Sequence, residues 1–172
     1  VTGLKEDVEN HTEVIAGLQE DLSTLGSNVE GLEAGSWAPS LPGAYLRNID
    51  SNFIRIPGAN LEGADLTSAN LRWADLGGGN FSGTLMTNAD LQGANLESAD
   101  FSDAIMRQTV LISANLRNGD FQRAILSSAR MAGADLRNAD MQNATMNLAQ
   151  LEGAVLSGAN LVGADLDEAY LQ

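Results

Sequence analysis

Residues 59–78 read ANLEG-ADLTS-ANLRW-ADLGG, and this five-residue pattern continues without insertion or deletion to the end of the sequence. Every fifth residue from Ile56 to Leu171 is Leu, Ile, Met or Phe. The residue two places before the large one is Ala in 19 of 23 repeats, and Asn or Asp stands between them in 14 of 23. The register extends back to Leu46 and Leu41. An unbroken repeat of this kind predicts a solenoid.

A period of five fits neither of the regular secondary structures. A helix turns about 100° per residue, so apolar residues at every fifth position would spiral around its surface. On a flat strand, an odd period would place successive large residues on opposite faces. We therefore expect one bend per repeat, so that four repeats of five residues close a square coil of 20 residues. Ala and the large residue then point inward, and Asn or Asp at the bend can bond the local backbone.

The pattern resembles that of the pentapeptide-repeat family, which is written A(N/D)LXX. The resemblance covers roughly three quarters of the chain. It implies an all-β solenoid, the right-handed quadrilateral β-helix, whose hand the period alone does not fix. We expect regular coils over residues 56–172 and a linker with an irregular capping coil over residues 36–55. Several residues of that coil are expected to help cover its open end: Trp37, Pro39, Pro42 and Tyr45.

In a 20-residue coil, each residue stacks on the residue 20 positions later. Phe81, Phe101 and Phe121 then share one central column, which predicts an internal ladder of rings. Ala104 and Ala124 should be buried beside the same bends.

Residues 1–35 follow a different rule, which predicts an α-helical coiled coil used for oligomerisation. Apolar residues, with one His, alternate spacings of four and three and form the seam: Leu4, Val8, His11, Ile15, Leu18, Leu22, Leu25, Val29 and Leu32. Mostly β-branched residues at a with Leu at d favour a parallel dimer, with a trimer as the alternative. Glycines weaken this helix, so it depends on association. Packing back on the rod as an intramolecular cap is the other interpretation.

Composition excludes several classes of function. The formal net charge of −14 argues against a nucleic-acid or anionic-membrane partner. Without Cys there are no disulfides, thiolate catalysis or Cys-zinc sites, and the compartment stays open. No apolar run comes close to the length of about 20 residues that a membrane-spanning helix needs. Residue 1 is Val rather than Met, so either a leader has been removed or the chain is an excised piece.

No catalytic, cofactor or metal motif is present in the sequence. There is no Ser-His-Asp set, P-loop, zinc pattern or dinucleotide motif, and the only His, His11, lies in the predicted seam. We therefore expect a protein that is not an enzyme and has no cofactor.

One outward column carries an acidic ladder, Asp100, Asp120 and Asp140, flanked by Asn residues. Carboxylates about one strand spacing apart repel one another unless they share a cation. Arg123 lies close enough in the repeat to offset part of this charge. A solvated surface, a cation site and an anionic recognition surface are the three interpretations.

Another outward position, normally Asn or Asp, carries aliphatic residues in three successive coils: Leu85, Ile105 and Ile125. Val110 lies one face further along the chain. We call these four residues the aliphatic patch. Exposed apolar stripes often mark a contact surface, although β-branched ladders also stabilise sheets with no partner involved.

Phe53 and Trp73 are one coil apart at the second outward position and are the aromatic residues of their column. We expect the two exposed rings to form an offset stack, either as a clamp on the irregular first coil or as a patch for a partner.

Together these features predict a non-enzymatic structural or protein-interaction module, a rigid rod carried on a homo-oligomeric stalk, with an unknown protein partner. The resemblance implies one alternative, because some pentapeptide-repeat proteins bind DNA gyrase as acidic mimics of DNA. Those relatives dimerise through a C-terminal element, and some carry projecting loops. Here the array is unbroken, and the additional segment is N-terminal.

Overall fold

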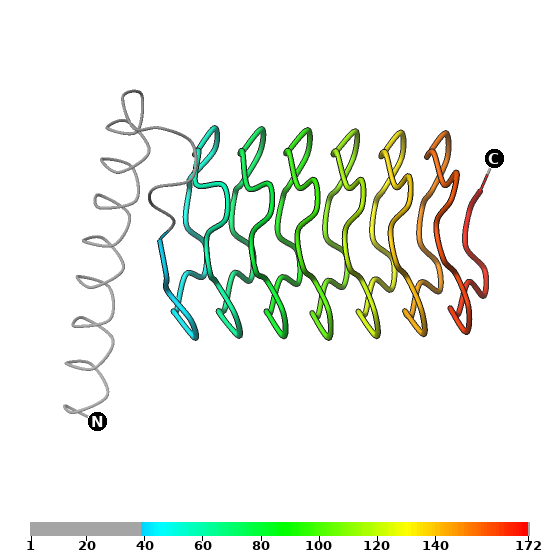
Figure 1. The fold of residues 1–172 in the computed structure, drawn as a ribbon, viewed down its shortest axis with the longest axis horizontal. Helices are drawn as coiled ribbons and strands as arrows, with labels where there is room; N and C mark the ends of the chain where they lie inside the picture. The colour runs from blue at the N-terminus through cyan, green and yellow to red at the C-terminus, as the bar shows by residue number, and fades with distance from the viewer. Residues whose placement is uncertain (1–38, 172) are drawn as a thin grey trace.

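Stacked coils form a rod in the computed structural model, which describes residues 39–171 (Figure 1). Single bridging residues at every fifth position pair with the residue 20 places later, from Ser40↔Asn60 to Gln150↔Tyr170, and every pair is parallel. Over residues 39–171 these isolated bridges take the place of longer strands, and no helix is found. The predicted register of 20-residue coils is confirmed.

A tight turn between successive bridges produces the period of five. In the repeat that starts at Ala64, the N–H of Ala69 donates to the carbonyl of Leu66 at 3.0 Å, and Ser68 has a φ of 58°. A positive φ at the third residue is the geometry of a type II turn. The same position has a positive φ along the rod, which explains its many glycines and short polar residues.

The core is a narrow column filled alternately by Ala and by large apolar side chains. Phe81, Phe101 and Phe121 are fully buried, with ring centroids 5.0 and 5.1 Å apart and interplanar angles of 13° and 12°. Ala104 and Ala124 are also fully buried. The predicted internal Phe ladder is therefore confirmed.

Two of the exceptions to Ala make room for these rings. A Cβ added at Gly79 would lie 2.6 Å from a ring atom of Phe81. One added at Gly119 would lie 2.8 Å from a ring atom of Phe121. Because real Cβ atoms do not approach so closely, glycine precedes these two phenylalanines for steric reasons.

The first coil already follows the bridging register. Ile49 and Ile54 are buried at positions that elsewhere hold Ala, whereas Ser51 stands at a central position. Beside Ser51 lies an apolar cavity of about 10 Å³. Pro39 is buried, whereas Pro42 and Tyr45 are exposed, and their role in covering the open end stays a prediction.

Several predictions lie outside the described residues. These are the coiled coil of residues 1–35, its seam with His11, and the position of Trp37. Between residues 39 and 171 there is no helix that could cross a membrane.

Candidate functional site

The outward Asn and Asp side chains complete the backbone hydrogen bonding of the rod. In each repeat, N–H groups donate to the coils on either side and across the turn. The N–H of the first residue after the large one has no such partner. In thirteen repeats it donates instead to the Oδ1 of the Asn or Asp two residues earlier, at 2.8 to 3.4 Å. This pairing gives the Asn/Asp position its structural reason.

The acidic ladder lies where the sequence predicts, as the continuous bridges Asp100↔Asp120↔Asp140. The Oδ1 of each carboxylate accepts a backbone N–H at 2.8, 2.9 and 3.1 Å respectively. Across the described part of the chain, no three acidic or His side chains are grouped so that they could hold a metal ion. The arrangement therefore favours a hydrogen-bonded, solvated ladder over a cation site.

Arg123 has a closer partner than the ladder. Its Nε and one Nη donate to the two carboxylate oxygens of Asp103, each at 2.7 Å. These hydrogen bonds hold the pKa of Asp103 below its usual range, and Asp120 contributes only a smaller electrostatic effect on Arg123. The sequence did not identify this pair, because it depends on the direction in which each long side chain leans.

The aliphatic patch occupies two adjacent faces. Leu85, Ile105 and Ile125 bridge consecutively on one face, and Val110 lies on the next face, between Asp90 and Arg130. Leu85 is 39% exposed, and the other three are half-buried. Half-buried Ile112, which sequence reasoning missed, extends the patch beyond Val110.

The patch lacks the local acceptors found elsewhere on the rod. Aliphatic side chains cannot accept a hydrogen bond, so the N–H groups of Thr87, Arg107 and Ser127 have no protein acceptor among residues 39–171. In thirteen other repeats the equivalent N–H donates to an outward Asn or Asp, whereas outside the patch it also lacks an acceptor within residues 39–171 at Gly77, Asn147 and Ser157. Beside the patch the three N–H groups form a row of free donors.

The charge around the patch is opposite to that of the whole chain. Residues 104–134 contain four Arg and a single Asp, but Asp103 and Asp135 lie directly outside this stretch and Asp103 pairs with Arg123, so residues 103–135 carry a net charge of +1, whereas the whole chain carries −14. Arg107 stands at the corner between the two faces, and Arg130 bridges to Val110. Both are exposed, and neither makes an ion pair with any residue that the structure describes.

Phe53 and Trp73 are both exposed, at 65% and 48%, but Trp73 lies against a different neighbour from the one expected. A Cβ added at Gly93 would fall 2.1 Å from the indole ring, so the ring covers the backbone of Gly93 in the following coil. The ring stacks found in residues 39–171 are those of the internal Phe ladder, so the predicted Phe53–Trp73 stack is wrong. The bare backbone at Gly93 offers the indole a flat surface that Phe53 does not provide.

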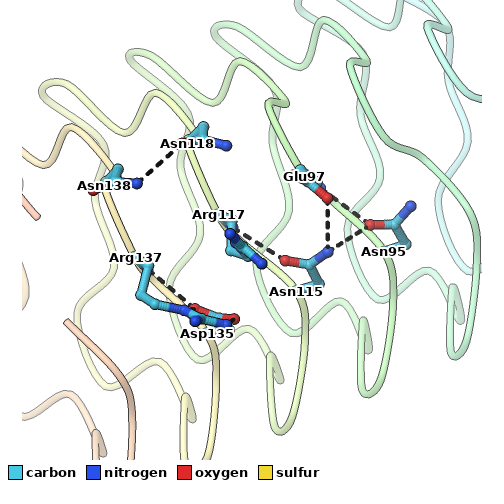
Figure 2. A network of polar contacts seen from close by, with 8 residues as sticks. All are labelled: Asn95, Glu97, Asn115, Arg117, Asn118, Asp135, Arg137 and Asn138. Atoms are coloured by element: carbon cyan, nitrogen blue, oxygen red, sulfur yellow. Dashed lines mark hydrogen bonds and ion pairs between the residues drawn. The ribbon is translucent and has the colours of Figure 1, made fainter. Parts of the chain in front are cut away.

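A polar network ties the coils together, as Figure 2 shows. Its bridging residues Asn95, Asn115 and Asp135 lie half a coil away from the column of Leu85. The Nδ2 of Asn115 donates to the Oδ1 of Asn95 at 3.0 Å and to Glu97 at 3.3 Å. The Nε of Arg137 donates to Asp135 at 2.8 Å, and the hydrogen bonds from Arg137 lower the pKa of Asp135 to about 2. These side chains largely satisfy one another, so this face has a structural role.

Comparison with known proteins places this rod in a family. The sequence profile described as pentapeptide repeats matches the chain in eight copies, over residues 52–83, 64–103, 104–143 and 134–172. The chain belongs to the pentapeptide-repeat family. Proteins of this family adopt the right-handed quadrilateral β-helix and are generally non-enzymatic structural modules.

Solved structures of pentapeptide-repeat proteins resemble the rod. Rfr23, from the cyanobacterium Cyanothece 51142, is 23% identical, and the match covers 77% of this chain and 91% of that one with a TM-score of 0.53. HetL, involved in heterocyst differentiation regulation in the cyanobacterium Nostoc sp. strain PCC 7120, is 25% identical over 72% of this chain and 87% of its own, with a TM-score of 0.34. QnrB1, a plasmid-mediated fluoroquinolone resistance protein, is 18% identical over 78% and 90%, with a TM-score of 0.38.

The likeness to Rfr23 shows that this pentapeptide-repeat protein shares a fold with it. No curated protein is similar enough to match the chain.

Proposed function

We propose that this protein is a non-enzymatic interaction module that binds a protein partner through the aliphatic patch. The observation that carries the proposal is the replacement of Asn or Asp by aliphatic residues in three successive coils. Each replacement removes the side-chain acceptor of a backbone N–H and leaves an apolar side chain partly exposed at a position that is Asn or Asp in most repeats. A partner that covered the patch would bury the side chains and supply acceptors for the free N–H groups.

The competing explanation is a ladder that stabilises the rod without a partner. Cross-strand aliphatic pairs contribute about 0.2–1 kcal/mol each. The lost hydrogen bond to each N–H is of similar size, about 0.5–1.5 kcal/mol. Stability alone therefore gives no clear reason for aliphatic residues at Leu85, Ile105 and Ile125, whereas a binding surface does.

The proposal is tested by quantitative affinity capture from native cells with the triple variant Leu85→Asp, Ile105→Asp, Ile125→Asp. A matched control places three charges at exposed positions about half a coil away, as Ser98→Asp, Asn118→Asp, Ser157→Asp. We expect the patch variant to lose at least tenfold of a specific co-captured protein that the control retains. Equal retention by the two variants, with equal melting temperatures, would contradict the proposal.

An acidic DNA mimic that binds gyrase is the alternative function. The observations in its favour are the net charge of −14 and the stacked carboxylates of the acidic ladder. Against it, residues 103–135 carry a net charge of +1. A gyrase supercoiling assay at high protein excess decides this point, since a DNA mimic inhibits or modulates supercoiling and an interaction module of another kind does not.

We further propose that residues 1–35 join copies of the chain as a parallel dimer. The heptad pattern of the seam supports this assembly. Two rods on one stalk would present two aliphatic patches, which raises the effective affinity for a partner with repeated sites.

A further inference from the structure

The chemistry around the aliphatic patch indicates what kind of partner fits it. This inference rests on the proposed function, because it names the occupant of the same surface. Three properties of the patch have to be matched: its apolar side chains, its positive charge and its free backbone donors.

The charge specifies an acidic partner. Arg107 and Arg130 flank Val110 and make no ion pair in the described part of the rod. Five other arginines there pair with a carboxylate, as Arg123 does with Asp103, and Arg117 does not. A protein with a charge of −14 repels acidic molecules in general, so the exposed Arg107 and Arg130, which form no ion pair within residues 39–171, make this region a place where one can dock.

The free N–H groups point to the same conclusion. Thr87, Arg107 and Ser127 each present a backbone N–H that has no acceptor within residues 39–171, and these donors repeat at about 4.8 Å, the spacing of stacked coils. On the adjacent face the N–H groups of Ile112 and Ala132 also have no protein acceptor within residues 39–171. Carboxylates are strong acceptors for such donors.

The spacing favours a helical partner over an extended one. Leu85, Ile105 and Ile125 cover two coil steps, about 9.6 Å. Two turns of an α-helix rise about 10.8 Å and present one residue of the same face per turn. In an extended strand every second residue lies on the same face, so three such residues span about 13 Å. This span is longer than that of the three coils, so the side chains of a strand would fall out of register with them.

We propose that the occupant of the aliphatic patch is an amphipathic, acidic α-helix lying along the rod axis. Its apolar face covers Leu85, Ile105 and Ile125. Its carboxylates lie at the corner that carries Arg107, where they accept hydrogen bonds from the arginine and from the free N–H groups.

The probe for this proposal is a display library of amphipathic helical peptides. The apolar face is fixed as Leu or Ile at one position per turn, and each flanking position is Glu or Lys at random. Selection is carried out on the purified full chain. We expect at least tenfold enrichment of Glu over Lys on one flank of the apolar face, even though the net charge of −14 favours Lys.

A double variant, Arg107→Glu, Arg130→Glu, is the matched control target, and it should abolish or reverse the Glu enrichment. Enrichment of Lys, equal use of Glu and Lys, or recovery of no binder from the library would overturn the acidic-helix inference. These results are separate from the fate of the proposed function. If the Leu85/Ile105/Ile125→Asp variant still loses its captured protein, the patch binds a partner of other chemistry.

Discussion

At the residue scale, the rod depends on one small residue per repeat. Ala at the corner is buried in nearly every coil, and Gly replaces it where the following Phe ring approaches the backbone, as at Gly119. Each inward position therefore accepts a narrow range of volumes, because the core is only one side chain wide. The outward positions carry no such limit, which is why surface chemistry varies freely along the rod.

Gly119→Ala should destabilise the rod, because the added Cβ would lie 2.8 Å from the ring of Phe121 and 3.2 Å from the carbonyl of Leu116. We expect the free energy of unfolding to fall by about 1–3 kcal/mol. The control is Gly77→Ala, whose Cβ would meet only the movable amide of Asn95 at 3.3 Å among close neighbours. Urea unfolding followed by circular dichroism compares the two, and equal stabilities would show that the ring has room to move.

Indole fluorescence can report the contact between Trp73 and Gly93. The measurement uses a Trp37→Phe background, so that Trp73 is the single tryptophan. Asn tolerates the positive φ of Gly93, but its side chain would displace the ring, so Gly93→Asn should red-shift the emission. Gly83→Asn is the control, since a Cβ there meets nothing within 4 Å. Phe53→Ala should leave the emission unchanged, and a red shift in that variant would restore the stack that the sequence suggested.

At the element scale, most five-residue repeats complete their backbone hydrogen bonds through the turn, the neighbouring coils and an outward Asn or Asp, and this explains both what the sequence predicts and what it misses. The spacing of Ala, Asn or Asp and Leu determines the bend, the inward positions and the 20-residue register, so coils and core could be predicted. Contacts of long exposed side chains, such as Arg123 with Asp103 and Trp73 with Gly93, could not. They depend on side-chain torsions that no periodicity encodes. The excess of Arg over Asp in residues 103–135 was readable from the sequence, but its importance appeared only beside the unpaired N–H groups.

The pair of Asp135 and Arg137 makes stability depend on pH. The folded-state pKa of Asp135 is depressed to about 2, so its stabilising contribution is complete above its unfolded pKa, about 3.9, and is lost as pH falls through about 2. Asp135→Asn should lower the melting temperature at pH 7 by roughly 1–4 °C, and the difference from the parent should vanish near pH 2. Asp167→Asn is the control, because Asp167 forms no ion pair within residues 39–171. A difference that persists at pH 2 would contradict the ion-pair explanation.

At the scale of the whole molecule, the protein is a rod whose faces differ in chemistry. One face carries the hydrogen-bonded acidic ladder, another carries the polar network of Figure 2, and the patch itself combines apolar side chains with basic charge. Because all coils share one backbone geometry, these differences come from side chains alone. The rod therefore holds a fixed surface in place without needing a conformational change.

Removal of the residues before Trp37 tests how this rod is assembled. If residues 1–35 form a coiled coil, the full chain should sediment as a dimer and the truncated chain as a monomer with its β-helix intact by circular dichroism. The same oligomeric state for both chains would favour the interpretation of the segment as an intramolecular cap.

Site-specific photo-crosslinking in native cells tests whether a protein partner contacts the aliphatic patch. A photoreactive residue replaces Gln108, at the corner between Ile105 and Val110, or Asn118, half a coil away at the opposite corner. We expect a discrete protein adduct from position 108 and none from position 118. The adduct at position 108 should be lost when Ile105 is also changed to Asp. An adduct of equal yield at both corners, or no adduct at position 108, would contradict the claim that this pentapeptide-repeat protein binds its partner through the aliphatic patch.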